Sequence, residues 1–457
     1  MRMRYYDEPA KRLPAREFGV VVAGGGTAGV VAAIASARQG VPTALVESKG
    51  YPGGIAVEGG TALHSFFNLW KAFPGVEKRQ VVKGIPQEII DRLIENGGTT
   101  GHVEMVEGYQ YDSVCTAIDT ELYKLTAFEM LAEAGVHVFV NTLLVGAVMD
   151  GQKILGAIVE SRAGREVFFA DSFIDCTGYG DLSAFAGASF TEPNDHPVAN
   201  SMGVGGVDID RYHEFFKNSG ALYESALGPR SGENGKVVRV GASVSRMDQE
   251  LLRKAREIGL AFVTTTVHDN YFMFLKLNYQ MDKSPTNRDE SVKAELELRR
   301  RQQAAIKLLR ENIPGCEKAF IARSSPSLCI RRGRCIECDY DISIDDVLSG
   351  VHFKDDIMAY GFHDCAPRLQ IKNGGTYGIP YRALRVKNVE NLLATGMIIT
   401  SNWEAHMSTR NTVACMGQGQ AAGTAAALCS KEGVGTRGLN YETLRQALLE
   451  GGVHLEN

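Results

Sequence analysis

Three glycines in the order Gly24-x-Gly26-x-x-Gly29 constrain the fold of this chain more than any other feature. They follow a β-branched run at residues 18–23 and precede an alanine-rich stretch of helical character at 30–38. In such a β-α-β unit the first glycine permits a tight turn, the second lets backbone amides approach a pyrophosphate, and the third lets helix and strand pack closely. Glu47, which ends the next apolar run, would accept hydrogen bonds from ribose hydroxyls. The sequence therefore predicts an α/β fold of Rossmann type that binds FAD or NAD.

The charge balance excludes several classes of partner. The 457 residues carry 49 Lys and Arg against 54 Asp and Glu, a net charge of -5, whereas general nucleic-acid and anionic-membrane binders need dense basic surfaces. We therefore expect a small-molecule substrate and no nucleic-acid or membrane partner, and a homo-oligomer is left open. Nine cysteines in a chain this long do not suggest a disulfide framework, which favours a reducing, cytoplasmic location. The basic start and the apolar run at 19–37 are similar to a signal peptide, but Gly24, Gly25 and Gly26 interrupt that run.

The apolar pattern divides the chain into five parts. Helical spacing at 88–96 and 113–134 is followed by short β runs at 136–141, 144–149, 154–161 and 166–170, which predict an antiparallel meander, and by a strand at 172–175. A mixed region with a charged helix at 290–312 comes next, and a strand at 391–395 and a helix at 417–429 then restore the nucleotide-fold pattern. We predict an N-terminal tail (1–16), a dinucleotide-binding domain in two segments (17–188 and 361–440), an inserted mixed α+β substrate domain (189–360), and a C-terminal helix and tail (441–457).

A second glycine loop after Glu47, with the sequence SKGYPGGI, favours FAD over NAD, because only the longer flavin dinucleotide needs it. The segments GGGTAG, ESKGYPGG, DCTGYGDLSAFAGA, YGIPYRAL, NLLATG and GQGQAAGTAAAL are distributed between about residues 18 and 430. Together they resemble the successive motifs of the FAD-dependent oxidoreductase family within the glutathione-reductase-like flavoproteins. The resemblance implies a glutathione-reductase-like FAD-binding domain.

The resemblance also implies a role for each motif. The pyrophosphate would be held by Gly24, Gly26, Thr27, Ala28 and Gly29, and the adenosine ribose by Glu47 and Ser48. The loop Gly53, Gly54 and Ile55 would lie beside the ribityl chain and the flavin, and Leu144 and Val145 would meet the adenine. Thr177 and Gly178 would close over the dinucleotide with Asp181 nearby, and Gly396 and Met397 would lie at the ribityl phosphate. The segment that contains Gly419, Ala421 and Ala422 would begin a helix whose N-terminus points at the flavin and stabilises negative charge on it.

A second nucleotide motif for NAD(P)H is not evident. Gly178-x-Gly180-x-x-Ser183 lacks the last glycine, and Gly203-x-Gly205-x-x-Asp208 is not followed by a suitable helix. We therefore expect the flavin to be reduced by the organic substrate, or by a separate electron carrier.

Candidate catalytic residues lie in the second half of the chain. Arg331 and Arg334 match a family pair of arginines, and a guanidinium suits a carboxylate or an anionic intermediate. The resemblance makes His363 the leading candidate for a general base, with a structural histidine as the alternative, and His406 and Arg410 come next. Trp403 stands where the family often has histidine, and His64 and Asn68 could line the cavity. The roles of Cys329, Cys335 and Cys338 are left open, because their spacing disfavours a metal site.

The function that these residues predict is the removal of a hydride from a small organic substrate to flavin N5, with a separate electron acceptor left open. The alternative is a flavin-dependent reductase of an activated carbon–carbon double bond. An FAD-dependent RNA-modifying protein is disfavoured by the net charge. An FAD-holding scaffold without turnover is a fourth hypothesis.

Overall fold

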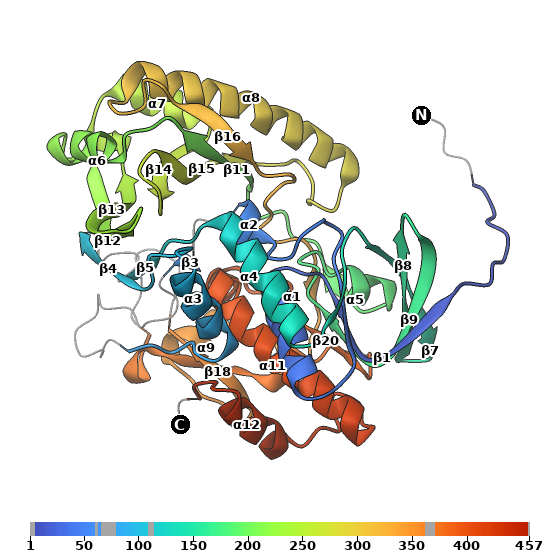
Figure 1. Ribbon diagram of the computed structural model, residues 1–457. Coiled ribbons are helices and arrows are strands. Elements are labelled where there is room, and N and C mark those ends of the chain that lie inside the picture. Colours follow the sequence, from blue (N-terminus) through green and yellow to red (C-terminus); the bar gives the residue numbers. More distant parts are fainter. Residues whose placement is uncertain (1–4, 60–62, 65–78, 108–113, 362–370, 456–457) are drawn as a thin grey trace.

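The computed structural model describes residues 5–59, 63–64, 79–107, 114–361 and 371–455. Within these ranges most strands belong to two large sheets (Figure 1). The first sheet has seven strands in the order β6-β2-β1-β9-β8-β7, with β20 paired to β9. The second has nine strands in the order β16-β11-β15-β14-β13-β12-β4-β5-β3.

The first sheet contains the predicted β-α-β unit. The strands of this sheet are β1 (Ala15–Ala23), β2 (Thr43–Val46), β6 (His137–Phe139), β7 (Leu143–Asp150), β8 (Lys153–Ser161), β9 (Gly164–Asp175) and β20 (Leu392–Ala394). β1 pairs in parallel with β2 and β9, and β20 adds in parallel to β9. The strand β20 follows β9 by more than two hundred positions in the chain, so two distant segments build one sheet. Val20, Val21 and Val22 are fully buried, as expected for a strand covered on both faces.

The predicted meander differs from the structure at both ends. Its first run, β6, pairs in parallel with β2 and belongs to the Rossmann part of the sheet. The last run and the following strand form one continuous strand, β9, whose first half pairs with β8 and whose last residues pair with β20. β8 and β20 thus pair with successive parts of β9, while β1 pairs with β9 from Val167 to Asp175.

Helices cover the first sheet and pack on one another. They are α1 (Thr27–Arg38), α3 (Ile85–Glu95), α4 (Thr120–Glu133), α11 (Thr412–Glu432) and α12 (Tyr441–Glu450). α11 crosses the middle of the molecule beside α1 (Figure 1). A Cβ atom on Gly419 would lie 2.2 Å from the carbonyl oxygen of Ala28, and one on Gly423 would lie 2.1 Å from that of Ala32. The two glycines therefore allow the backbones of α1 and α11 to touch.

The second sheet forms a separate layer with its own core. Its strands are β3 (Leu63–His64), β4 (Val103–Glu107), β5 (Val114–Thr116), β11 (Val198–Gly205), β12 (Leu222–Arg230), β13 (Glu233–Ala242), β14 (Leu260–Thr265), β15 (Tyr271–Tyr279) and β16 (Phe320–Ser324). Helices α6 (Ile209–Asn218), α7 (Gln249–Glu257) and α8 (Arg288–Asn312) accompany it, and α8 packs against β11, β15 and β16 at the outer side (Figure 1).

Two differences from the sequence analysis concern residues 63–134. β3, β4 and β5 pair within the second sheet, although the predicted boundary placed them in the first segment of the dinucleotide domain. Such pairing between distant segments leaves no local pattern. The expected helix at 113–134 begins only at Thr120, because Asp119 caps it by accepting hydrogen bonds from the backbone N–H groups of Glu121 and Leu122.

Short elements complete the described chain. They are α2 (Ile55–Glu58), α5 (Asp181–Phe185), β10 (Phe190–Thr191), β17 (Cys335–Ile336), α9 (Ile344–Ser349), β18 (Asp356–Tyr360), β19 (Tyr377–Pro380), α10 (Trp403–Thr409) and the 3₁₀ turns η1 (Val244–Arg246), η2 (Asn373–Gly375) and η3 (Tyr381–Ala383). Among the helices described, none combines the length and the apolar character that crossing a bilayer requires.

Candidate functional site

The glycine turn between β1 and α1 forms a cradle open to one side. Gly24 has φ +95°, and a Cβ there would come within 2.5 Å of the Cys176 carbonyl oxygen. A Cβ on Gly29 would lie 1.8 Å from the oxygen of Gly24, so this residue sets the contact between helix and turn. At Gly26, by contrast, a Cβ would meet no atom within 4 Å. No side chain caps α1 at Gly26, which leaves the first amides of the helix available to an anionic ligand.

Glu47 is held rigidly at the end of β2. Its carboxylate accepts hydrogen bonds from the backbone N–H groups of Gly25 and Lys49, both at 2.8 Å, and from the Ser48 hydroxyl at 3.1 Å. A carboxylate has about four lone-pair sites, so acceptor capacity remains for a ribose. Glu58, on α2, is ion-paired to Lys49 at 2.5 Å on the same side of the turn.

These groups line a cavity of about 400 Å³, which we call the dinucleotide cavity. The predicted cofactor residues that line it are Gly24, Gly26, Thr27, Ala28, Glu47, Ser48, Gly54, Ile55, Thr177, Gly178, Asp181, Gly396 and Met397. The predicted Leu144 also lines the cavity, but the predicted Val145 does not. Leu143 and Thr142 line it instead. Gly29 and Gly53 do not line the cavity but shape the turn, since the Gly53 N–H donates to the Gly25 oxygen at 2.8 Å.

The prediction that a helix begins near Gly419 is wrong. α11 begins at Thr412, with Asn411 as its N-cap residue, so Gly419, Ala421 and Ala422 lie inside the helix. All three are buried, and none of them lines the dinucleotide cavity. Gly419 contacts α1, as described above, and the positive end of the helix lies at Asn411 and Thr412.

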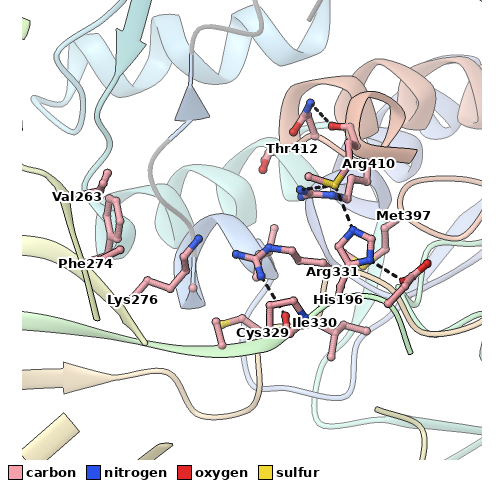
Figure 2. A pocket seen from close by; sticks show the side chains of 18 of the residues that line it. His196, Val263, Phe274, Lys276, Cys329, Ile330, Arg331, Met397, Arg410 and Thr412 are labelled. Carbon is pink, nitrogen blue, oxygen red and sulfur yellow. Dashed lines mark hydrogen bonds and ion pairs between the residues drawn. The ribbon is translucent and has the colours of Figure 1, made fainter. Parts of the chain in front are cut away.

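A second cavity, of about 580 Å³, adjoins the first, and we call it the adjoining cavity. The two cavities share Ile55, Cys329, Ile330 and Met397 in their walls. One side of the adjoining cavity is formed by the second sheet and the other by α10 and the start of α11. In Figure 2 the labelled side chains of Phe274 and Lys276 lie at one side, those of His196 and Arg410 at the other, and Arg331 lies between them.

An imidazole–carboxylate pair lies in the wall of the adjoining cavity. His196 Nδ1 is 2.7 Å from Asp195 Oδ1, and Asp195 Oδ2 accepts from Arg332 at 2.8 Å. Burial lowers the pKa of His196 below 6.5 against the opposing effect of Asp195, and Arg410 and Arg331 lower the pKa further. His196 is therefore neutral at neutral pH and can accept a proton.

The sequence analysis missed this histidine. The adjacent Asp195 and His196 were the only local signal, and they lie in a loop without a family motif.

The predicted catalytic residues other than His406 separate into three groups. Arg331 and Arg410 line the adjoining cavity, and Arg331 is held by the Pro197 oxygen at 3.0 Å. Arg334 turns away, because it donates to Asp181 at 2.8 Å and to the Tyr179 oxygen at 3.0 Å. His363 and Asn68 lie outside the described residues, and of His64 only the backbone is described.

The prediction for His406 needs correction, because its side chain is fully buried and does not line the adjoining cavity. Trp403 and Met407 on α10 and its C-cap residue Arg410 line that cavity, but His406 does not, although it has the same helical spacing to Trp403 and Arg410. Its Nε2 is 3.0 Å from the Met397 oxygen. Burial, with Arg332 and Arg410, lowers the pKa of His406 well below 6.5, so the ring is neutral and positions Met397.

The three cysteines that could suggest a metal are buried and free. Burial raises the pKa of all three thiols: the pKa of Cys335 rises to about 11, and the pKa of Cys338 lies well above its usual value. The raised pKa values disfavour the thiolate form, which is the form that binds metals. Cys329 lies between the two cavities. In the part of the chain that the structure describes, no three His, Cys, Asp or Glu side chains gather as a metal site.

Comparison with known proteins identifies the family. Residues 19–448 match the model of the family described as FAD dependent oxidoreductase. No curated protein sequence matches this chain. Similar solved structures include a geranylgeranyl bacteriochlorophyll reductase-like protein from Thermoplasma acidophilum, with 13% identity, TM-score 0.49 and coverage of 96% of this chain and 85% of that chain. Another is a p-nitrophenol 4-monooxygenase from Pseudomonas putida, with 12% identity, TM-score 0.46 and coverage of 97% and 91%.

The fit of the site to a dinucleotide agrees with the family match. The open side of Gly26, the uncapped start of α1 and the carboxylate of Glu47 provide the donors and acceptors that a pyrophosphate and a ribose need. The match extends over most of the chain. The protein belongs to the FAD dependent oxidoreductase family and is an enzyme that depends on FAD.

Proposed function

We propose that this enzyme oxidises a small organic substrate that binds in the adjoining cavity. The observation that carries the proposal is the shared wall of Ile55, Cys329, Ile330 and Met397, which brings a cavity with an imidazole base next to the dinucleotide cavity. When bound, FAD supplies the oxidising chemistry, because a flavin accepts a hydride at N5. We include in the proposal a separate electron acceptor, which the sequence left open.

The residues that would hold FAD are those of the dinucleotide cavity. The amides at the start of α1 would bind the pyrophosphate, and Glu47 would accept from the adenosine ribose. Asn411 and Thr412, at the positive end of α11, lie in the wall of the adjoining cavity and favour negative charge there. The order β6-β2-β1-β9-β20 of the parallel strands is that of a Rossmann-type sheet, and the second sheet built largely from the chain between β9 and β20 supports an inserted substrate domain. The finer assignment to glutathione-reductase-like flavoproteins stays a prediction.

His196 is the base that the described residues offer. Asp195 accepts from the Nδ1–H group at 2.7 Å, which fixes the tautomer and leaves the lone pair on Nε2. Nε2 lies 3.1 Å from the sulfur of Met407, which has no proton to donate, so in this tautomer the Nε2 lone pair can accept a hydrogen bond from a substrate hydroxyl or amine. The neutral ring can therefore take a proton while the substrate is oxidised. His363 remains a prediction for the same role.

Arg331 and Arg410 give the cavity its preference for oxygen-rich or anionic groups. Either guanidinium could also orient a carbonyl in the reverse reaction, the reduction of an activated double bond. An experiment without oxygen distinguishes the two directions of electron flow.

An anaerobic screen tests the proposal. Candidate hydroxy acids, alcohols and amines are added to the FAD-loaded enzyme without oxygen, and the visible absorbance band of the oxidised flavin is followed. We expect at least one compound to bleach the band, whereas free FAD in the same mixtures stays oxidised. A band that persists with every compound, together with rapid reoxidation of chemically reduced enzyme by activated alkenes, would favour the double-bond reductase instead.

A further inference from the structure

One face of the second sheet forms the wall of the adjoining cavity. Glu224 pairs with Gly241 and Gly241 with Val263, while Ala261 pairs with Lys276. Opposed residues of neighbouring strands share a face, and alternate residues along a strand do so too. Arg239, two positions from Gly241, therefore lies on the same face as Glu224 and Lys276. All of these residues except Gly241 line the cavity.

Arg239 and Glu224 form a buried ion pair in this wall, and each side chain is only 3% exposed. Arg239 Nε and Nη2 donate to Glu224 Oε2 at 3.1 and 2.6 Å. A Cβ on Gly241 would lie 2.9 Å from the Glu224 side chain, so this glycine makes room for the carboxylate. Burial opposes the charge of Arg239, but Glu224 raises the pKa of the guanidinium, which therefore stays charged.

The remaining nitrogen of Arg239, Nη1, is buried and has no hydrogen-bond partner. Arg230, on the neighbouring strand β12, is a useful comparison. Its Nε, Nη1 and Nη2 donate to Asp269, the Val237 oxygen and Asp210, and it does not line the cavity. Buried polar groups in proteins are nearly always paired, and those that are not have a functional or solvent explanation. The unpaired donor of Arg239 is therefore a candidate ligand-binding group.

The charges around the cavity indicate the sign of the ligand. Among the described residues, its walls carry the cations Arg239, Lys276, Arg331 and Arg410 and the carboxylates Asp195 and Glu224. Both carboxylates already accept hydrogen bonds from arginines. The surplus of positive charge favours an anion, and because the cost of desolvating an ion grows more steeply with its charge than the attraction does, a singly charged carboxylate is favoured over a doubly charged phosphate.

We propose that Arg239 Nη1 binds the carboxylate of the substrate, with Lys276 contributing positive charge, so that the enzyme acts on small carboxylic acids. This inference rests on the proposed function, because it places the substrate in the same cavity. Arg239 thus determines specificity from the wall opposite to His196.

Equilibrium binding to the FAD-loaded enzyme tests the proposal. Three acid and amide pairs, acetate with acetamide, lactate with lactamide, and benzoate with benzamide, are titrated while the visible spectrum of bound FAD and the thermal unfolding midpoint are recorded. Inorganic phosphate is a fourth probe. We expect at least one acid to bind about tenfold or more tightly than its amide and more tightly than phosphate, because a hydrogen bond between ions is lost with the amide.

Variants connect the binding to Arg239. Arg239→Met should weaken the best acid about tenfold or more and leave its amide unchanged. Because this variant leaves Glu224 unpaired and could fail to fold, the double variant Arg239→Gln with Glu224→Gln removes both charges and should show the same loss. Arg230→Gln, the matched control, should keep the affinity of the wild type.

Three results would overturn the proposal: no acid binds better than its amide, phosphate binds best, or the double variant retains the wild-type affinity for the acid. The readout does not depend on turnover, so it separates this inference from the proposed oxidation. Tight acid binding that depends on Arg239, without bleaching by any compound, would contradict only the oxidation. Bleaching by neutral substrates with no preference for acids would contradict only the carboxylate site.

Discussion

Replacing Gly419 by alanine tests whether this glycine serves helix packing and not the cofactor. The new Cβ would lie 2.2 Å from the carbonyl oxygen of Ala28, and ordinary contact starts at 3.4 Å, so α1 and α11 would have to separate locally. Overpacking of this kind costs about 1–3 kcal/mol and sometimes more, while alanine gains about 1 kcal/mol over glycine in a helix. Since the obstacle is backbone and cannot rotate away, we expect a net loss of about 2 kcal/mol.

Gly417→Ala, in the same helix, is the matched control. There the new Cβ would lie 2.7 Å from the end of the Met358 side chain, which is flexible and can move. We expect this variant to stay within about 1 kcal/mol of the wild type. Urea denaturation with and without added FAD, followed by far-ultraviolet circular dichroism, gives the free energy of unfolding of all three proteins. A Gly419→Ala protein as stable as Gly417→Ala would refute the packing role of Gly419.

Three further predictions concern the cofactor, the base and pH. Gly26→Val should lower FAD affinity more than about tenfold, measured by fluorescence titration, because valine fills the open space beside the first amides of α1. The FAD-free protein should lose only about 1 kcal/mol of unfolding free energy, because a Cβ there meets no protein atom within 4 Å and the cost is that of valine at an N-cap. His196→Gln should reduce turnover by about 10²–10⁴-fold. In the wild type, kcat/KM should fall as the pH drops through the pKa of His196, which lies below 6.5. If His196→Gln shows the same fall at acid pH, His196 is not the base. His406 has a lowered pKa in the folded protein, so the unfolded state binds more protons below pH 6.5 and stability is lost there as pH falls. His406→Gln should therefore weaken the acid loss of unfolding free energy in urea titrations, and an identical pH slope would argue against it.

The cofactor side of the site could be predicted because its signals are local. Gly24, Gly26 and Glu47 act through backbone geometry and through hydrogen bonds at the ends of β1 and β2, and a short sequence segment contains both. The start of α11 could not be placed in the same way. No charged residue or proline marks a boundary after Thr412, and Gly417 and Gly419 suggest a helix start although they lie inside the helix, where they allow close contact.

The substrate side depends on contacts that no local pattern contains. The wall with Arg239 and Lys276 exists because β13 and β15 are strands of one sheet and place these two side chains on the same face. The same sheet also contains β3, β4 and β5, which come from a distant segment of the chain. Periodicity does not separate the residues of α10 either. His406 is three residues after Trp403 and four before Arg410, so helical spacing alone places it on the same face as both. Only the packing of the folded chain shows that Trp403, Met407 and Arg410 line the cavity whereas His406 is fully buried.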